Sequence, residues 1–156
     1  MPEKKKRDWR QFRLKIEIAA KPEKVFRAWT DDRIVPRWFC VKAEIKPKKK
    51  GRLYFEWLGG DKLETRVIDI KKNRLFFFPF GPKGEKVKLT IKPLKKCSGL
   101  ELYQYDTTPE DGLAVHNGCE TGWTFFLANL KAYLEQGIDL RSHDPKKSYL
   151  QGYINS

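Results

Sequence analysis

The sequence is poor in histidine and cysteine, and this shortage argues against metal and redox chemistry. The chain has 156 residues, of which 2 are histidines and 3 are cysteines. Cys40, Cys97 and Cys119 are widely spaced and form no C-x-x-C pair, so we expect reduced thiols. His116 and His143 have no second ligand at metal-binding spacing. We therefore predict no metal site and no cofactor.

Long apolar runs and catalytic signature motifs are also missing. No stretch approaches the roughly 20 apolar residues that cross a bilayer, and the N-terminus lacks the apolar core of a signal peptide. We therefore expect a cytoplasmic protein without a transmembrane segment. No nucleophile elbow, P-loop or H-E-x-x-H motif occurs. The sequence thus contains no ready-made catalytic residues, and we predict none.

Large side chains and positive charge are abundant instead. Apolar residues make up 40%, aromatic residues 13% and charged residues 34% of the chain, with a net charge of +13. Such a composition is typical of one globular domain with a charged surface. The positive field would attract an acidic protein or another polyanion. Because the basic residues are scattered over predicted turns and the aromatic residues are expected to be buried, the pattern does not favour nucleic acid as a partner.

Alternation and turn signals predict an antiparallel sheet of six or seven strands. Residues Phe12 to Ile18 alternate apolar and charged side chains, which is typical of a strand with one buried face. Further strands are expected in the middle of the chain. Their connections are short, which favours antiparallel neighbours. The expected strands cover residues 53–57, 63–70, 75–78, 87–91 and 100–105.

Helical patterns frame this run of strands. Residues 22–29 begin with proline and glutamate and predict a short helix, and a second short helix is expected from Asp31 toward Trp38. A long helix is expected from an N-cap at Asn117 to a C-terminal glycine at Gly137. We divide the chain into a basic arm (residues 1–11), one domain (12–141) and a polar tail (142–156). Because the tail could dock on its own domain or on a second copy, both a monomer and a homodimer fit the sequence.

Two segments resemble a known superfamily. Residues Ala20 to Thr30, followed by Trp38-Phe39, are similar to the opening of START-like (SRPBCC) proteins. Residues Gly122 to Arg141 resemble the C-terminal helix of the branch named after the activator of the heat-shock protein 90 ATPase. The resemblance implies an α+β helix-grip fold, in which a curved sheet wraps around the long helix. It also implies a cavity between the sheet and that helix, which different members use for small molecules.

The candidate ligand-binding residues come from inward-facing positions around this cavity. Tryptophan suits an amphipathic pocket, because its ring is apolar and its indole N–H can address a polar atom. Strand parity places Gln104 on the same face as Leu102, where a buried amide needs a partner. The candidates are Trp29, Trp38, Phe55, Trp57, Phe76, Leu102, Gln104, Trp123 and Leu127. We expect them to bind a small apolar or amphipathic molecule without catalysis.

Two alternatives stay open. The chain could be a co-chaperone-like interaction module whose basic surface meets a chaperone or another acidic protein. It could also be a cyclase- or hydrolase-like enzyme that uses Gln104, Tyr103 or Glu56 near the mouth of the pocket. A space between sheet and helix that is filled by side chains would favour the interaction module.

Overall fold

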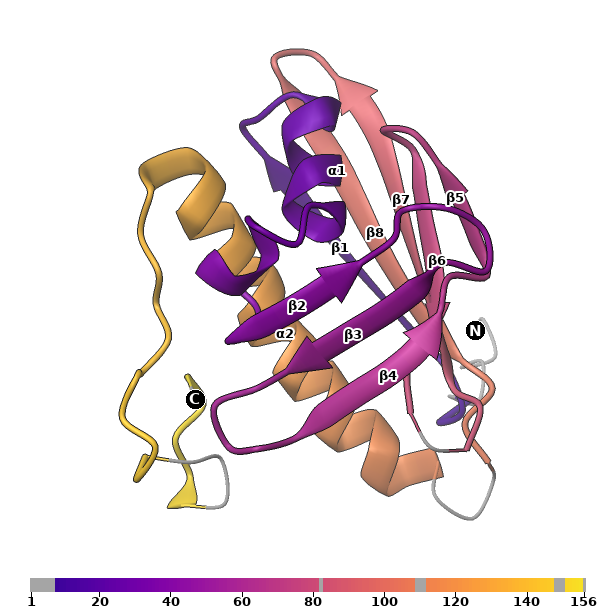
Figure 1. Ribbon diagram of the computed structural model, residues 1–156, viewed down its shortest axis with the longest axis vertical. Helices are drawn as coiled ribbons and strands as arrows, with labels where there is room; N and C mark the ends of the chain where they lie inside the picture. The colour runs from indigo at the N-terminus through magenta and orange to yellow at the C-terminus, as the bar shows by residue number, and fades with distance from the viewer. Residues whose placement is uncertain (1–7, 82, 109–111, 148–150, 156) are drawn as a thin grey trace, which may run out of the picture.

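The chain forms two antiparallel sheets and a long helix around one core (Figure 1). The computed structural model describes residues 8–81, 83–108, 112–147 and 151–155. The helices are α1 (Pro22–Thr30), the short 3-10 helix η1 (Val35–Arg37) and α2 (Gly112–Gln136). The strands are β1 (Phe12–Ile18), β2 (Lys42–Ile45), β3 (Arg52–Glu56), β4 (Lys62–Arg66), β5 (Asp69–Lys71), β6 (Leu75–Pro79), β7 (Lys86–Leu94) and β8 (Cys97–Tyr105).

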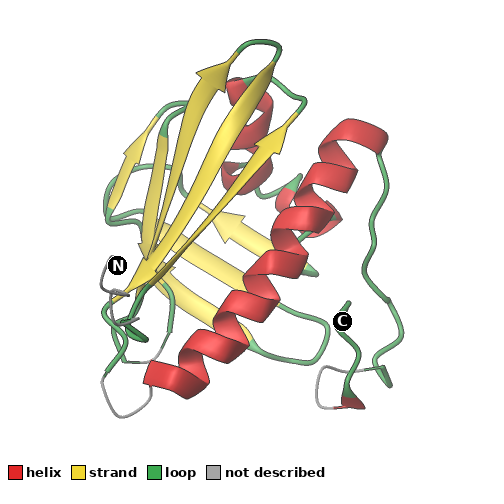
Figure 2. Cartoon of the chain, turned by 180° about the vertical axis from the view of Figure 1, so that it is seen from behind, coloured by secondary structure: helices red, strands yellow, loops and turns green. Residues whose placement is uncertain are grey.

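The larger sheet has the strand order β1-β8-β7-β6-β5, and the smaller one has the order β2-β3-β4. All pairs are antiparallel, and Leu102 of β8 lies between Leu14 of β1 and Leu89 of β7. Figure 2 shows α2 as one long helix that runs past both sheets. This arrangement confirms the predicted α+β helix-grip architecture, with two short helices after the first strand.

The sheet differs from the prediction in its continuity. The expected strand over residues 63–70 is divided into β4 and β5. The Val67 N–H donates to the carbonyl of Gly51, whereas the Ile68 N–H donates to the carbonyl of Phe77. Within two residues the chain therefore changes its hydrogen-bond partner from the residue before β3 to β6, and it passes from the smaller sheet to the larger one. Together with β2, which the sequence analysis missed, this makes eight strands in the described part of the chain instead of six or seven.

The long helix begins earlier than expected. Asn117, predicted as the N-cap, is exposed within α2, which starts at Gly112. A polar side chain that points to solvent is tolerated at such a position, and packing overrides its preference for a helix end. The other end is as predicted. Gly137 has a φ of +68° and its N–H donates to the carbonyl of Tyr133, which is the geometry of a glycine C-terminal cap.

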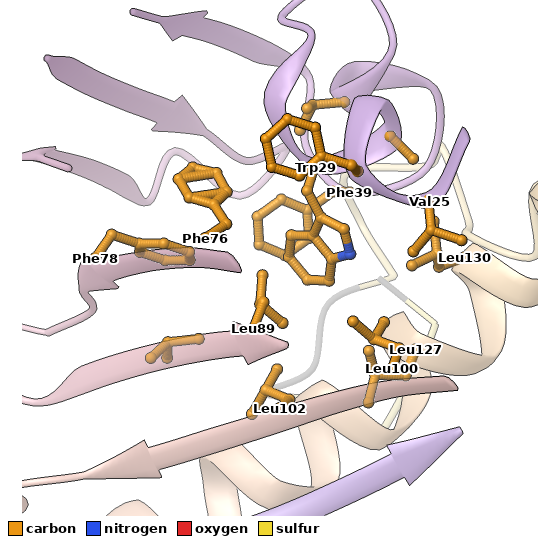
Figure 3. Close-up of a cluster of buried hydrophobic side chains, with 14 of the residues drawn as sticks. Val25, Trp29, Phe39, Phe76, Phe78, Leu89, Leu100, Leu102, Leu127 and Leu130 are labelled. Atoms are coloured by element: carbon orange, nitrogen blue, oxygen red, sulfur yellow. The ribbon is translucent and has the colours of Figure 1, made fainter. Parts of the chain in front are cut away.

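Aromatic residues fill the space between α1, η1 and the sheets. Trp29, Trp38, Phe39, Phe55 and Phe76 are at most 1% exposed. The rings of Trp29 and Trp38 meet edge to face, with centroids 4.7 Å apart. Figure 3 shows Trp29 in the middle of this cluster, next to Phe39 and above Leu89. The centre of the domain is therefore packed with side chains.

Candidate functional site

A cavity of about 540 Å³ lies at the edge of this core, beside the first half of α2. Its other walls come from the η1–β2 connection, the turn between β3 and β4, the β6–β7 connection and the chain after α2. The aromatic lining consists of Phe39, Trp57, Phe80, Trp123 and Phe126. The ionisable and polar part of the lining consists of Asp61, Arg141, Ser142, His143, Asp144 and Lys147. We call this hollow the α2 pocket.

Two glycines of α2 help to keep the pocket open. Gly118 and Gly122 are four residues apart, so they share one face of the helix, and both line the pocket. A Cβ atom added at either position would meet nothing within 4 Å. Close packing therefore does not require these glycines. Each costs a helix about 1 kcal/mol relative to alanine, and their common effect is to leave space beside Trp123.

Phe39 organises the apolar wall. Its ring stacks on Trp123 with centroids 5.5 Å apart and planes 13° apart. It meets Trp57 at 5.3 Å and Phe126 at 4.9 Å, both edge to face. Phe80 contacts Trp123 from the β6–β7 connection at 4.9 Å. Residues from α2 and from three connections, η1–β2, β3–β4 and β6–β7, thus form one continuous aromatic surface.

A buried hydrogen bond fixes Trp123. Its indole Nε1 donates to Oε1 of Gln104 over 2.9 Å, and Gln104 is 1% exposed. Within the described part of the chain, Nε2 of Gln104 has no conventional hydrogen-bond partner, and the Cys119 thiol is its neighbour. Burial raises the pKa of the neighbouring Cys119 thiol, and the Gln104 amide opposes that rise only in part. Cys119 is therefore a neutral thiol in the wall of the pocket.

The chain after α2 is held in place by Asn129, which is fully buried. Its Nδ2 donates to the carbonyl of Trp38 at 2.8 Å and to Oδ1 of Asp139 at 3.0 Å. Its Oδ1 accepts a hydrogen bond from the N–H of Leu140 at 2.6 Å. One amide thus connects the helix, the η1 region and the segment that forms the outer wall of the pocket.

Arg141 completes this anchor. Its guanidinium donates to the carbonyls of Cys40 and Pro36 at 3.0 and 2.9 Å, and it pairs with Asp139 at 3.0 Å. Burial would raise the pKa of Asp139, but hydrogen bonds from Arg141 and Asn129 outweigh it and hold the pKa below the usual value. Asp139 is therefore ionised near neutral pH and balances the charge of Arg141.

The outer rim of the pocket carries charges of both signs. Asp61 lies in the β3–β4 turn, and His143, Asp144 and Lys147 follow Arg141. His143 Nε2 lies 3.2 Å from the Asp139 carboxylate. An apolar floor with a polar rim suits an amphipathic molecule, whose polar atoms would meet the rim while its apolar part lies against Trp57 and Trp123.

The structure divides the predicted ligand-binding residues into two groups. Trp57 and Trp123 line the α2 pocket. The others lie outside its lining, are at most 3% exposed and belong to the packed interior: Trp29, Trp38, Phe55, Phe76, Leu102, Gln104 and Leu127. Strand parity identifies inward positions, but it does not tell which of them α1 and η1 cover. The sequence analysis missed Phe39, Phe80 and Phe126, although Phe126 follows Trp123 by three residues on the same helix face.

The residues of the enzyme alternative do not converge. Tyr103 and Gln104 are neighbours on β8, so their side chains point to opposite faces of the sheet. Glu56 on β3 accepts a hydrogen bond from Tyr54 at 2.9 Å. Across the described residues, no group of three or more histidine, cysteine or carboxylate side chains could hold a metal ion. In the same ranges, no helix has the length and apolar character to cross a membrane.

Comparisons with known proteins point to one family. The family model described as "Activator of Hsp90 ATPase homolog 1-like protein" matches residues 19–135. No curated protein sequence matches the chain.

Solved structures agree on the fold. A protein from Staphylococcus saprophyticus superposes with a TM-score of 0.76 at 18% identity, over 85% of this chain and 96% of that one. The Aha1 dimer from Colwellia psychrerythraea gives 0.72 at 20% identity, over 81% and 97%. A Mesorhizobium loti protein gives 0.73 at 23% identity, over 83% and 99%. At these identities the likeness concerns the fold.

Proposed function

Since the chain belongs to the START-like family of activator of Hsp90 ATPase homolog 1-like proteins, whose fold supports binding modules, we propose that it binds a small apolar or amphipathic molecule in the cytoplasm without catalysing a reaction. The observation that carries this proposal is the aromatic α2 pocket of about 540 Å³. Pockets for small molecules commonly measure about 300–1,000 Å³ and are mostly apolar with a few polar groups.

The proposed site is displaced from the one that the sequence suggested. We expected the ligand between the sheet and the long helix, but Leu127 and the interior aromatic residues pack against one another in the middle of that space. The α2 pocket lies further toward the start of the helix, where Gly118 and Gly122 present no side chain. The ligand would therefore lie between α2 and the β3–β4 turn, with Trp57 and Trp123 as its main apolar contacts.

A pair of substitutions at Gly122 tests this proposal. Gly122→Leu projects a large side chain into the pocket, whereas Gly122→Ala adds one methyl group and serves as the matched control. The probe is 8-anilinonaphthalene-1-sulfonate, an amphipathic molecule whose binding is followed by its fluorescence and by calorimetry. We expect a stoichiometric site in the wild type and in Gly122→Ala, and a loss of at least about tenfold in affinity in Gly122→Leu.

The control also protects the test from effects on folding. Alanine and leucine are both better helix formers than glycine, so neither variant should weaken α2. Equal binding of the probe to Gly122→Leu and wild type would place the ligand elsewhere. A wild-type protein that binds neither the probe nor a series of saturated fatty acids would contradict the proposed function itself.

A second candidate is an interaction module for an acidic protein such as a chaperone. The family description and the net charge of +13 favour it, and so does the filled space beneath α2. The test is binding to a purified Hsp90-type chaperone at increasing salt, because contacts between exposed charges are screened beyond about 8 to 10 Å at physiological ionic strength. Salt-sensitive binding that persists in Gly122→Leu would support this candidate over the pocket.

A further inference from the structure

The outer face of the five-stranded sheet, away from α1 and the core, carries an ordered set of aromatic and basic side chains. The register aligns Phe77 of β6, Lys88 of β7, Tyr103 of β8 and Arg13 of β1 in one row across four strands. Each of the four points away from the buried positions that alternate with it. Lys86 and Tyr105 form the neighbouring row. We call these six residues the outer-face platform.

The aromatic rings of the platform are nearly parallel. Tyr103 and Tyr105 stack with centroids 4.8 Å apart and planes 16° apart. Phe77 stacks on Tyr105 from across the sheet, with centroids 6.1 Å apart and planes 24° apart. All three rings are half-buried, so part of each is accessible. The expectation that the aromatic residues are buried therefore does not hold on this face.

Cations accompany each ring. The guanidinium of Arg13 lies 3.8 Å from the centroid of Tyr103, and the ammonium groups of Lys86 and Lys88 lie 5.8 and 4.9 Å from Tyr105 and Phe77. These contacts are weak at exposed sites and exchange readily. Two of these cations are also ion-paired, Arg13 with Glu101 at 2.7 Å and Lys86 with Asp106 at 2.6 Å. Exposed pairs of this kind contribute little stability, so phosphate groups could compete for the same cations without a change in the backbone.

The charge of the whole face is positive. The outward positions of the sheet carry three carboxylates, Glu17, Asp69 and Glu101, and two of these are paired, Asp69 with Lys49 at 3.4 Å and Glu101 with Arg13 at 2.7 Å. The basic residues at outward positions are Arg13, Lys15, Lys71, Lys86, Lys88 and Lys92.

Two further features extend this surface beyond the platform. The loop that contains Lys48, Lys49 and Lys50 lies beside β5, because the Lys50 N–H donates to the carbonyl of Val67. On the other side, the polar lining of a shallow groove consists of Lys15, Thr90 and Lys92 together with the carboxylates of Glu17 and Glu101. A strand of a linear polyanion could therefore follow the face past the rings.

We propose that the outer-face platform binds single-stranded nucleic acid. Accessible, nearly parallel rings can stack on unpaired bases of any sequence, and flanking lysine and arginine side chains can neutralise the phosphates. A second copy of the chain is disfavoured, because two positive faces repel each other. A duplex is disfavoured as well, since its bases are already stacked. The proposal is independent of the α2 pocket, which lies on the inner side of the fold.

Fluorescence anisotropy of the full chain with a labelled oligouridylate of about 12 nucleotides tests the proposal. We expect saturable binding at about 50 mM salt that weakens steeply as salt rises. Tyr105→Leu should reduce the affinity about tenfold, because base stacking is lost. Phe77→Leu should also reduce the affinity, so the conclusion does not depend on one variant that could misfold. Circular dichroism checks that both variants are folded.

Charge-matched variants separate a specific platform from general attraction. Lys88→Gln removes one charge from the platform, and Lys62→Gln removes one from exposed β4 of the smaller sheet. If the oligonucleotide binds to the outer-face platform, Lys88→Gln must weaken its binding clearly more than Lys62→Gln does. The proposal would be overturned if Lys88→Gln and Lys62→Gln weakened binding equally, or if Tyr105→Leu and Phe77→Leu both kept the wild-type affinity. It would also be overturned if a duplex, or vesicles with phosphatidylserine, bound as tightly as the oligouridylate. Gly122→Leu should bind the oligonucleotide as the wild type does, which keeps this test separate from that of the pocket.

Discussion

The indole of Trp123 donates its N–H to the side-chain oxygen of Gln104, and this buried bond joins α2 to β8. It orients the tryptophan that stacks on Phe39 and lines the α2 pocket. A polar link between two otherwise apolar surfaces fixes how the helix is rotated over the sheet, because an unpaired indole N–H in this place is costly. The residue pair therefore contributes both to stability and to the shape of the site.

Gln104→Leu should lower the free energy of unfolding by about 1–3 kcal/mol, since it leaves the buried indole N–H without an acceptor. Urea denaturation measures the change. Trp123→Phe removes the donor, so adding Gln104→Leu to it should cost less than it costs in the wild type. Equal costs in the two backgrounds would show that the bond contributes nothing to stability.

Asn129→Ala should destabilise the protein by roughly 2–3 kcal/mol, because the carbonyl of Trp38 and the N–H of Leu140 both lose their partner. Ala128→Asn is the matched control, since it places the same amide on the adjacent exposed position and should cost less than about 1 kcal/mol, the difference in helix propensity between the two residues. Both values come from denaturant unfolding. Similar effects of the two substitutions would refute the anchoring role of Asn129.

Acid should loosen the chain after α2. The pKa of Asp139 is lowered in the folded protein from its usual value of 3.8. A lowered pKa stabilises the fold above the unfolded value, and this contribution is lost as pH falls through the folded value. The difference in stability between wild type and Asp139→Asn should therefore shrink below about pH 4. Thermal unfolding between neutral and acid pH measures it, and a constant difference would contradict the assignment.

The cysteines should differ in reactivity. Burial raises the pKa of the Cys40 thiol to about 12, and Cys40 is 1% exposed. Cys97, in contrast, is half-buried. Because the thiolate is the reactive form, iodoacetamide near neutral pH should modify Cys97 well before Cys40. Peptide mapping by mass spectrometry follows both sites, and unfolding in urea should remove the difference. Equally fast modification of the two in the folded protein would show that the η1–β2 connection opens readily.

Gly122→Ala should raise stability by about 0.4–1 kcal/mol, because the added methyl group meets no neighbouring atom and restricts the unfolded chain. Gly118→Ala should act similarly at its exposed position on the helix. Chemical denaturation tests both variants. A loss of stability would mean that close packing, and not the pocket, requires these glycines.

The order of elements could be predicted because local patterns determine it. Alternation in residues 12–18 and 100–105 matches β1 and the end of β8, and the apolar period of α2 matches the helix up to Gly137. The break between Val67 and Ile68 could not be predicted, because it depends on two hydrogen-bond partners that are distant in sequence. Nor could the start of α2 be read from Asn117, whose preference for a helix end is weaker than the packing of the helix.

The location of the pocket was harder to predict than the fold. Trp29 and Trp57 are equally apolar in sequence, but α1 and η1 surround the first and leave the second at an edge. Asn129, Asp139 and Arg141 belong to the segment that resembles the family, yet their shared role appears only when the chain folds back toward Pro36. The paired glycines of α2 were the one local signal of open space.

The α2 pocket owes two of its walls to the β3–β4 turn and to residues 142–147, which lie outside the packed interior. Surface connections of this kind accept insertions and substitutions far more readily than core strands do. Relatives with the same framework could therefore acquire differently shaped hollows by altering these two stretches alone, with the buried tryptophans untouched.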